Sequence, residues 1–380
     1  MRYCMRCVYP AVAAAPLTFD ENGVCTGCRA FEQRKKIDWP ERRKQLIELL
    51  AEYKSDSNYD CIIPVSGGKD SYYQAHVIIK ELGLKPLLVT YHGNNYLPVG
   101  ERNLLRMREV FDCDHIICKP SVDTLVKLNR IGFHKMGDMN WHGHCGIFTY
   151  PVQAAYRFRV PLLIWGEHGY TDLAGMYSMN DYVEMTAKYR LEHAQRGFDW
   201  FDMVGQEGLR EKDLLWAKYP TDDEIDEVGI RGIYIFNYVP WDANDHAELV
   251  KKLYGWEENP EPFERTYRRI SNLDDMHENG MHDYLKYIKF GYGRATDHAC
   301  KDVRAGKLTR DQGVEMVRKY DHVKSSDLQR WLTYVGMTET EFDRVADTFR
   351  DPRVWRKDAS GAWLKDNLWD AQHDPRRPAP

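Results

Sequence analysis

The chain has 380 residues, of which 43% are hydrophobic and 13% aromatic, and its formal net charge is −5. A chain of this length holds about two or three domains, and its hydrophobic fraction excludes an intrinsically disordered protein. The acidic balance argues against a broad nucleic-acid-binding surface, although a local basic patch is compatible with it.

Two C-x-x-C pairs lie near the N-terminus, Cys4-Met-Arg-Cys7 and Cys25-Thr-Gly-Cys28, with seventeen residues between them. This spacing predicts a tetrahedral zinc site, because each turn presents two thiolates on one side and the intervening loop closes the cage. Iron is the alternative metal, and a redox dithiol or two unrelated pairs are the other interpretations. Four protein ligands leave no open position, so the site would serve folding or docking rather than catalysis.

The compartment expected from the sequence is the cytoplasm. The first ten residues, MRYCMRCVYP, lack the apolar core of a secretion signal, and no run approaches the ~20 apolar residues that span a bilayer. In such a chain, nine cysteines indicate metal ligands and reduced thiols.

In the middle of the chain, short apolar runs alternate with helical patterns. We expect helices at 39–53, 72–82, 103–111, 122–135 and 147–158, and strands at 61–65, 86–91, 115–118, 161–165 and 232–239. This alternation predicts an α/β fold with a parallel sheet and right-handed crossovers. The segment 169–220 is expected to be mainly helices and loops.

The C-terminal part is helical in pattern from Asp274 to about Phe349, and the residues 374–380 are expected to be frayed. Helix N-caps are predicted at Thr309, with Gln312 completing a capping box, and at Ser326. We therefore divide the chain into a cysteine knuckle (1–35), an α/β domain (36–245) and a helical C-terminal region (246–380).

A glycine pair follows the first predicted strand, in the stretch Ser66-Gly67-Gly68-Lys69-Asp70-Ser71. A strand, a glycine loop and a helix form an anion site, because the backbone approaches oxygens closely and the helix N-terminus attracts negative charge. Lys69 adds a cation, and Ser66 and Ser71 add hydroxyl donors. Asp70 would repel bare phosphate, so its presence predicts a divalent metal between the two.

This stretch is similar to the PP-loop (S-G-G-x-D-S) of the ATP pyrophosphatase superfamily. The resemblance implies that ATP is cleaved between its α- and β-phosphates, that AMP is transferred to a carbonyl or amide oxygen, and that the loop holds the leaving pyrophosphate. It also implies an adenine site near Tyr91, His92, Gly166 and Glu167. That placement agrees with the rule that ligands bind at the carboxyl ends of strands in open α/β sheets.

Further segments along nearly the whole chain resemble the N-acetyl sugar amidotransferase family of surface-polysaccharide biosynthesis. They are RYCMRCVYP (2–10), LTFDENGVCTGCRAFE (17–32), PVSGGKDS (64–71), CGIFTYP (145–151), PLLIWGE (161–167), YVPWD (238–242) and KFGYGRATDHA (289–299). The resemblance implies conversion of an acetamido group on a sugar, nucleotide-linked and destined for O-antigen or a related glycan, into an acetamidino group. The amide oxygen receives AMP, ammonia attacks the carbon, and AMP leaves. The resemblance also implies that a separate glutaminase subunit supplies the ammonia, which is consistent with the absence of an evident glutaminase domain from this sequence.

Several residues have more than one interpretation. Glu167 is predicted to act as a base that deprotonates ammonium, or to contact metal or ribose, or merely to cap a strand end. Asn95 is an amide donor to nucleotide or sugar, or a turn residue. Arg294 binds a sugar carboxylate or phosphate, or pairs with Asp297 on the surface.

The cluster Trp141-His142-Gly143-His144-Cys145 is expected just before a helix, on the rim of the pocket. His142, His144 and Cys145 would contact substrate, stabilise the fold, or bind metal or sulfur. The last possibility motivates an alternative function as a tRNA-thiolating enzyme of the same superfamily. A third hypothesis is a nucleotide-sensing scaffold that docks a glutaminase through its zinc knuckle.

Overall fold

The computed structural model describes residues 1–270 and 279–370. The predicted start of the C-terminal helices at Asp274 and the predicted fraying of 374–380 lie outside these residues.

The centre of the molecule is a six-stranded sheet in the order β3-β2-β1-β4-β6-β5. Its strands are β1 (Cys61–Pro64), β2 (Pro86–Tyr91), β3 (His115–Cys118), β4 (Leu162–Trp165), β5 (Glu184–Met185) and β6 (Arg231–Tyr234). All pairs are parallel except β5 with β6. The predicted α/β fold with a parallel sheet is therefore confirmed. The chain reverses its direction of travel across the sheet between β1 and β4, which is where open α/β sheets bind ligands.

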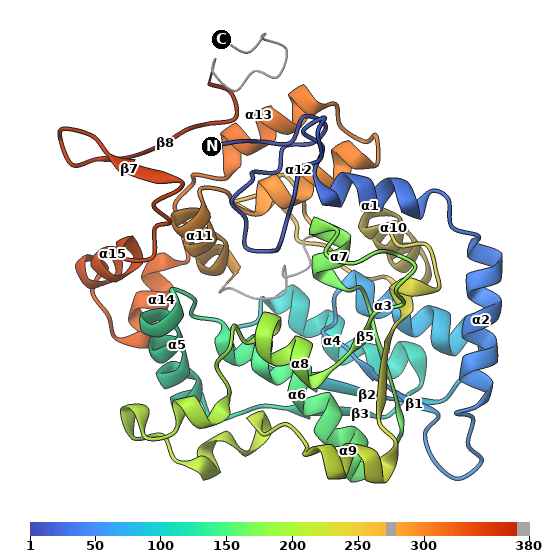
Figure 1. The fold of residues 1–380 in the computed structure, drawn as a ribbon. Helices are drawn as coiled ribbons and strands as arrows, with labels where there is room; N and C mark the ends of the chain where they lie inside the picture. The colour runs from blue at the N-terminus through green and yellow to red at the C-terminus, as the bar shows by residue number, and fades with distance from the viewer. Residues whose placement is uncertain (271–278, 371–380) are drawn as a thin grey trace.

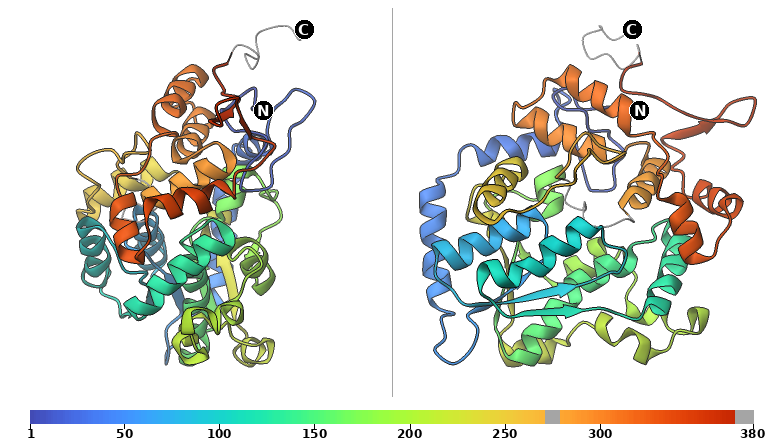
Figure 2. Two further views of the ribbon diagram at one scale, coloured as in Figure 1. Left: turned by 90° about the vertical axis from the view of Figure 1, so that its left-hand side faces the viewer. Right: turned by 180° about the vertical axis from the view of Figure 1, so that it is seen from behind.

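Helices cover both faces of this sheet. Helix α6 (Trp141–Phe158) packs against β1, β2 and β4 on one face, and α3 (Lys69–Ala75) and α4 (Pro98–Phe111) lie on the other (Figures 1 and 2). Helix α3 runs on into a π-helical turn at His76–Glu81. Helices α2 (Trp39–Ala51) and α10 (Ala243–Tyr254) add Leu46, Leu50, Ala247 and Val250 to the same core. Each side of the sheet is thereby buried, as its continuous apolar strands require.

Helix α6 starts six residues earlier than predicted, so the cluster 141–145 forms its first turns rather than a loop before it. Its glycines hid the helical pattern, but the packing requires one of them. A Cβ on Gly146 would lie 2.3 Å from Cδ2 of Tyr91. Helix α6 therefore lies closer to strand β2 than a residue larger than glycine at position 146 would permit.

The segment between β4 and β6 is composed of short elements, as predicted. They are α7 (Gly169–Ala174), α8 (Ala187–Tyr189), a π-helical turn (Arg190–Ala194), three 3-10 turns (Trp200–Met203, Gln206–Gly208 and Glu211–Ala217) and α9 (Asp222–Val228). The strand predicted at 232–239 is too long: β6 ends at Tyr234, and a 3-10 turn at Ile235–Asn237 follows it.

The C-terminal region contains α11 (Asn279–Phe290), α12 (Arg294–Arg304), α13 (Arg310–Tyr320), α14 (Leu328–Val335), α15 (Glu339–Asp347) and a hairpin of β7 (Trp355–Lys357) and β8 (Trp363–Lys365) that was not predicted. The capping box of Thr309 and Gln312 is confirmed. The predicted cap at Ser326 is wrong, because Asp327 holds the N-cap position of α14. Helices α5 (Val122–Met136), α11, α14 and α15 share a second core.

The N-terminal knuckle packs on the C-terminal region rather than standing apart. Its four cysteines share a buried cluster with residues of α12 and α13, and Figure 1 shows the N-terminal segment beside these helices. The amino group of Met1 lies 2.5 Å from Oδ2 of Asp366. This ion pair therefore joins the start of the knuckle to the segment that follows β8.

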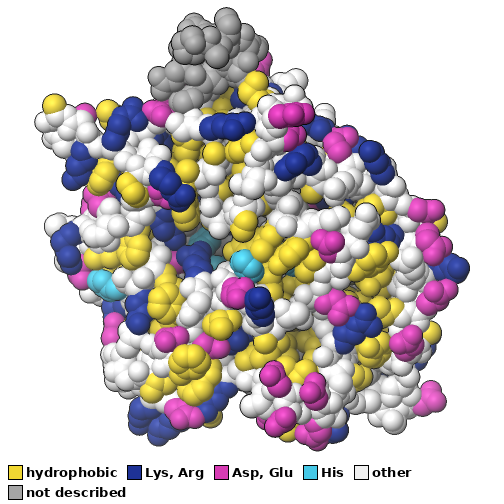
Figure 3. All heavy atoms as spheres, in the orientation of Figure 1, with side chains coloured by type: hydrophobic (Ala, Val, Ile, Leu, Met, Phe, Trp, Pro, Cys, Tyr) yellow, Lys and Arg dark blue, Asp and Glu magenta, His cyan; other side chains and the backbone are white. Residues whose placement is uncertain are grey.

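Among residues 1–270 and 279–370, no helix has the length and apolar character needed to cross a membrane. On the face in Figure 3, lysine and arginine side chains are interspersed with acidic ones, so this surface is mixed in charge.

The contact between α6 and β2 can be tested with Gly146→Ala. The free energy of unfolding should fall by about 1–3 kcal/mol, because the added methyl group forces Tyr91 or the helix to move. Urea denaturation measures this change. The control is Gly169→Ala at the start of α7, where nothing lies within 4 Å of the added Cβ. Equal stability of the two variants would contradict the close packing.

Candidate functional site

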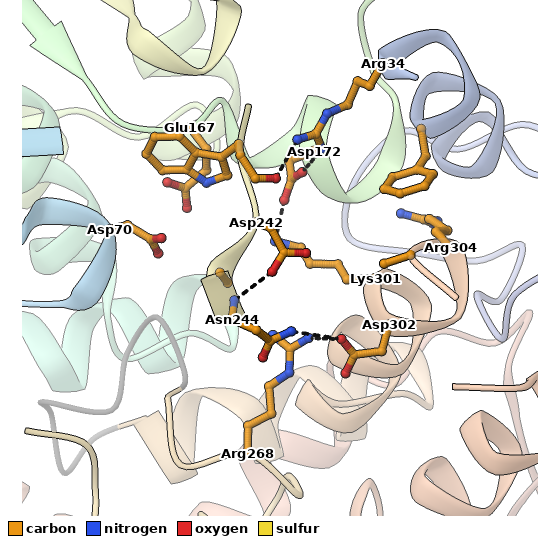
Figure 4. A pocket seen from close by; sticks show the side chains of 14 residues that line it. Arg34, Asp70, Glu167, Asp172, Asp242, Asn244, Arg268, Lys301, Asp302 and Arg304 are labelled. Carbon is orange, nitrogen blue, oxygen red and sulfur yellow. Dashed lines mark hydrogen bonds and ion pairs between the residues drawn. The ribbon is translucent and has the colours of Figure 1, made fainter. Parts of the chain in front are cut away.

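A pocket lies where the predicted knuckle, α/β domain and C-terminal region meet (Figure 4). The empty space in and in front of it, open solvent included, is about 500 Å³. Its lining is contributed by α1 (Thr26–Arg34), the glycine loop, the end of β4, α7, the segment before α10, the segment 263–270 and α12. The labelled side chains are Arg34, Asp70, Glu167, Asp172, Asp242, Asn244, Arg268, Lys301, Asp302 and Arg304.

The glycine loop connects β1 to α3, so the predicted strand–loop–helix arrangement is confirmed. Gly67 has φ of +84°, and a Cβ there would lie 2.7 Å from the backbone of Leu104 in α4. Only glycine combines this conformation with this close approach. The Trp256 indole N–H donates to the Gly67 carbonyl (3.0 Å), and the Ser66 N–H donates to Ser71 Oγ (3.0 Å). The loop is therefore held in a fixed shape.

Lys69 and Asp70 stand at the start of α3. Lys69 is 2% exposed, and its Nζ lies 3.0 Å from Oδ2 of Asp70. The other carboxylate oxygen lies 2.8 Å from Nδ1 of His246 in α10. Burial alone would raise the pKa of Asp70, but Lys69 and His246 outweigh it and hold that pKa well below its usual range. Asp70 is thus an ionised carboxylate on the pocket wall, as a metal ligand must be.

Glu167 follows β4 and lines the same pocket as Asp70. Burial, reinforced by the negative charge of Asp70, raises the pKa of Glu167 to about 7, and Lys301 offsets part of this rise. The two carboxyl groups therefore differ in protonation near neutral pH. A carboxylate with a pKa near 7 suits general acid–base work.

Asp172 of α7 holds two cations from distant parts of the chain. Arg34 Nη1 lies 2.7 Å from Oδ1, and Lys301 pairs with Oδ2. Burial would raise the pKa of Asp172, but Lys301 and Arg34 lower it to about 2. This ionised carboxylate fixes α1 and α12 on either side of α7 (Figure 4).

The C-terminal region completes the pocket with Arg268 and Asp302. Arg268 is 7% exposed, and its Nη2 lies 2.5 Å from Oδ1 of Asp302. Tyr267 also donates to Asp302, and Asn244 Nδ2 lies 3.4 Å from it. Hydrogen bonds and an ion pair among these side chains therefore fix the charged groups of this wall in place.

The four cysteines of the knuckle form one buried cluster, with all four sulfurs within 4.8 Å of one another. The Sγ–Sγ distances are 3.9 Å for Cys4–Cys28 and 3.7 Å for Cys7–Cys25. A tetrahedron with Zn–S bonds of about 2.3 Å has edges of about 3.8 Å, so these residues fit zinc. The backbone N–H groups of Cys25 and Arg6 donate to Cys4 Sγ, at 3.3 and 3.4 Å, as is common around metal thiolates.

The residues predicted near the adenine occupy different environments. The side chain of Tyr91 is buried under α6, where it packs on Trp216 and Gly146. His92 is 6% exposed, and its Nε2 lies 2.7 Å from Glu101. Gly166 is at the pocket end of β4, and its carbonyl accepts from the Phe236 N–H (3.2 Å).

Asn95 lies away from the residues that line the pocket, in the loop after β2. It has φ of +55°, and its Oδ1 lies 3.4 Å from Arg330 Nη2. This backbone conformation is a turn feature, in line with the second interpretation given for Asn95.

The cluster 141–145 divides into a buried part and an accessible part. His142 is fully buried, with Tyr91 and Asn129 each 3.1 Å from one of its ring nitrogens. Cys145 is fully buried, and burial raises the pKa of its thiol to about 12. Neither side chain is among those that line the pocket described above. His144 is half-buried beside His282 of α11.

Arg294 does not form the predicted surface pair with Asp297. Its guanidinium pairs with Asp283 of α11 at 2.9 Å, and Asp297 pairs with Lys286. Both acids are buried. These contacts join α11 to α12.

Seven charged residues of the pocket, and the one that holds Asp70, were not predicted from the sequence. They are Arg34, Asp172, Asp242, Arg268, Lys301, Asp302, Arg304 and His246. Each is separated from its partners by many residues, so no local pattern marked it. Asp242 is the last residue of the resembling segment YVPWD, and Lys301 and Asp302 stand just after the segment KFGYGRATDHA. These two segments were the available signals.

Comparison with known families identifies the C-terminal region. Residues 263–368 match the family described as "LPS biosynthesis protein WbpG-like, C-terminal domain". The matched range includes Arg268, Lys301 and Asp302 of the pocket. This region is therefore similar to that C-terminal domain, and for these residues the resemblance to surface-polysaccharide proteins is confirmed. No curated protein sequence matches the chain.

Two solved structures are similar to this chain. NMN synthetase from Francisella tularensis has 14% identity and a TM-score of 0.30, and the match covers 58% of this chain and 94% of that one. NH3-dependent NAD synthetase from Campylobacter jejuni, solved with the nitrate ion, has 14% identity and a TM-score of 0.29, and the match covers 50% of this chain and 92% of that one. The α/β fold of this chain is established by its own strand order and strand pairing, without these two similarities.

The raised pKa of Glu167 predicts how stability depends on pH. The folded state retains a proton between the ordinary pKa of about 4.3 and the folded value of about 7, so stability falls as pH rises through this range. A glutamine at this position has no proton to lose in this range, so Glu167→Gln removes this decrease in the free energy of unfolding. Relative to wild type, the variant should therefore gain about 1–3 kcal/mol between pH 4.5 and pH 8.

Urea denaturation of both proteins at several pH values provides the measurement. The exposed Glu48→Gln controls for the general effect of removing a carboxylate. Parallel curves of stability against pH for wild type and Glu167→Gln would contradict the shifted pKa.

Proposed function

We propose that this protein is an ATP-dependent amidotransferase that converts an acetamido group of a sugar into an acetamidino group during lipopolysaccharide synthesis. The observation that carries the proposal is the pocket itself. It joins a PP-loop carboxylate, a second carboxylate with a pKa near 7, and charged groups of a WbpG-like C-terminal domain. These groups support the proposal because a loop that would bind ATP and a region similar to a lipopolysaccharide-biosynthesis domain line the same pocket.

The nucleotide half of the reaction uses the glycine loop. The β,γ-pyrophosphate of ATP would lie on its backbone N–H groups and on Lys69, while Asp70 would hold Mg²⁺. The Lys69–Asp70 ion pair at 3.0 Å would then be exchanged for contacts to phosphate and to metal. Mg²⁺ would supply charge neutralisation on the leaving pyrophosphate. His246 would continue to orient Asp70 from its other oxygen.

The acceptor half begins with a poor electrophile, the amide carbon. Transfer of AMP to the amide oxygen makes that oxygen a good leaving group. Ammonia then attacks the carbon, a proton is lost, and AMP departs with the oxygen. Glu167 is the residue of the pocket best suited to take that proton, because its pKa lies near neutral pH.

The substrate and the ammonia source complete the proposal. The sugar is expected to be nucleotide-linked, and Arg268 and Lys301 offer cationic groups on the C-terminal wall. Ammonia would come from a separate glutaminase subunit. The alternative of tRNA thiolation needs a reactive thiol near the nucleotide, and the buried Cys145, with its raised pKa, does not favour it.

The products test this proposal. Protein, ATP, Mg²⁺, ammonium and a nucleotide-linked acetamido sugar should give AMP, pyrophosphate and a sugar in which NH replaces oxygen, detected by mass spectrometry. Lys69→Ala should lower turnover by at least about 10²-fold, because charge stabilisation of the leaving group is lost.

The matched control is Lys252→Ala, an exposed lysine at the end of α10, which should leave turnover unchanged. ADP as the only nucleotide product, or full activity of Lys69→Ala, would refute the assignment.

A further inference from the structure

Arg304, the last residue of α12, has an unusual environment for a guanidinium. It is 3% exposed, and its Nη2 lies 3.6 Å from Cys25 Sγ and 3.8 Å from Cys7 Sγ. Its Nη1 donates to the carbonyl of Leu173 in α7 (2.6 Å). Within residues 1–270 and 279–370, no carboxylate lies within ion-pair distance of it, and its Nε has no hydrogen-bond partner.

The carboxylate of Asp172 also acts on Arg304 through space, but both of its oxygens are paired with Arg34 and Lys301. The anionic group in direct contact with this buried cation is therefore the sulfur cluster. A divalent metal with four thiolates carries a formal charge of 2 − 4 = −2, whereas four thiols carry none. A buried guanidinium opposite neutral thiols would be an uncompensated charge, which is strongly destabilising. The position of Arg304 is favourable only when the cluster is loaded and negative, so metal binding and the docking of α12 should stabilise each other.

The knuckle is shaped to admit this side chain. A Cβ on Gly27, between the ligands Cys25 and Cys28, would lie 2.4 Å from Nη2 of Arg304 and 2.6 Å from the Leu173 carbonyl oxygen. The glycine of the second C-x-x-C pair is thus required by the approach of Arg304 and α7. The absence of a side chain at Gly27 therefore leaves the space that the Arg304 guanidinium occupies beside the cysteines.

The same helices line the candidate active pocket. Helix α1 begins directly after Cys25, and its Arg34 pairs with Asp172. Helix α12 carries Lys301, which pairs with the same carboxylate one turn before Arg304. Lys301 and Arg304 both belong to the last turn of α12 and both line the pocket, so a shift of α12 at Arg304 would also move Lys301.

We propose that Arg304 is a positioning residue that links the metal–thiolate centre to the candidate active pocket. It neutralises part of the charge of the loaded centre and fixes α12, and with it Lys301 and Asp302, against α7. Loss of the metal would then loosen α12 and disorganise the pocket wall. This link holds whatever group receives AMP, so it is tested separately from the reaction.

The first test measures how tightly the metal is held. Purified wild type, Arg304→Met and Arg304→Lys are loaded to one zinc per chain, and release to the chromogenic chelator 4-(2-pyridylazo)resorcinol is followed. Arg304→Met should release zinc about 10–100-fold faster, because outer contacts to metal ligands contribute that much to affinity. Arg304→Lys keeps the positive charge, so its rate of zinc release should lie between those of wild type and Arg304→Met.

The matched control is Arg310→Met. Arg310 also reaches the knuckle from the C-terminal region, but its Nη2 contacts the carbonyl oxygen of Cys4 (3.3 Å) rather than a sulfur. The variant Arg310→Met should therefore release zinc at the wild-type rate. Release from Arg304→Met at the wild-type rate would overturn the proposal.

A second test uses only the wild-type protein, in case Arg304→Met does not fold. Hydrogen exchange is compared by mass spectrometry before and after removal of the metal. Helices α7 and α12 should lose protection, whereas α14, in the separate core of α5, α11 and α15, should keep it. Unchanged protection of α7 and α12 after metal removal would overturn the proposal.

Discussion

The arrangement of this molecule depends on one buried carboxylate, Asp172. Its side chain is 7% exposed, and it binds Arg34 from the knuckle helix α1 and Lys301 from α12. A carboxylate taken out of water needs cations in good geometry, and removing either cation leaves an uncompensated charge. Asp172 therefore fixes the N-terminal and C-terminal parts of the chain against α7, which follows the β4 end of the sheet. The pocket forms at the place where these three parts meet.

The proposed chemistry follows from what each part brings to that place. The sheet supplies the glycine loop and two carboxylates at the point where its strand order reverses. Asp70 is held ionised by Lys69 and His246, whereas Glu167 has a pKa near 7. The C-terminal domain adds Arg268 and Lys301, and the knuckle holds that domain in place. An enzyme that makes a reactive adenylate needs such enclosure, because water would otherwise hydrolyse the intermediate.

The sequence predicted the sheet well, because its strands are short apolar runs whose pattern is local. Strands β2 and β3 begin and end at the predicted residues, and the fit of the four cysteines to a tetrahedral site follows the spacing of their pairs. The start of α6 was missed because Gly143 and Gly146 weaken the helical signal. Gly146 is nevertheless required by the close contact with Tyr91. The hairpin of β7 and β8 also escaped prediction.

The glycine loop was predictable because all of its functional groups are adjacent in sequence. The remainder of the pocket was not, since its ion pairs join residues far apart in the chain: Arg34 lies 138 positions from Asp172, and His246 lies 176 from Asp70. The cluster 141–145 shows the opposite error. Two histidines and a cysteine close together suggest chemistry, yet His142 and Cys145 are buried in the core, where their neighbours in space determine their role.

The proposed reaction places AMP on the amide oxygen of the sugar. Its most direct test is a substrate whose acetamido oxygen is labelled with ¹⁸O, turned over with ATP and ammonium, followed by mass spectrometry of the AMP. The AMP should carry the label, because the amide oxygen leaves with the phosphoryl group. Unlabelled AMP alongside an amidino product, or ADP in place of AMP, would contradict it.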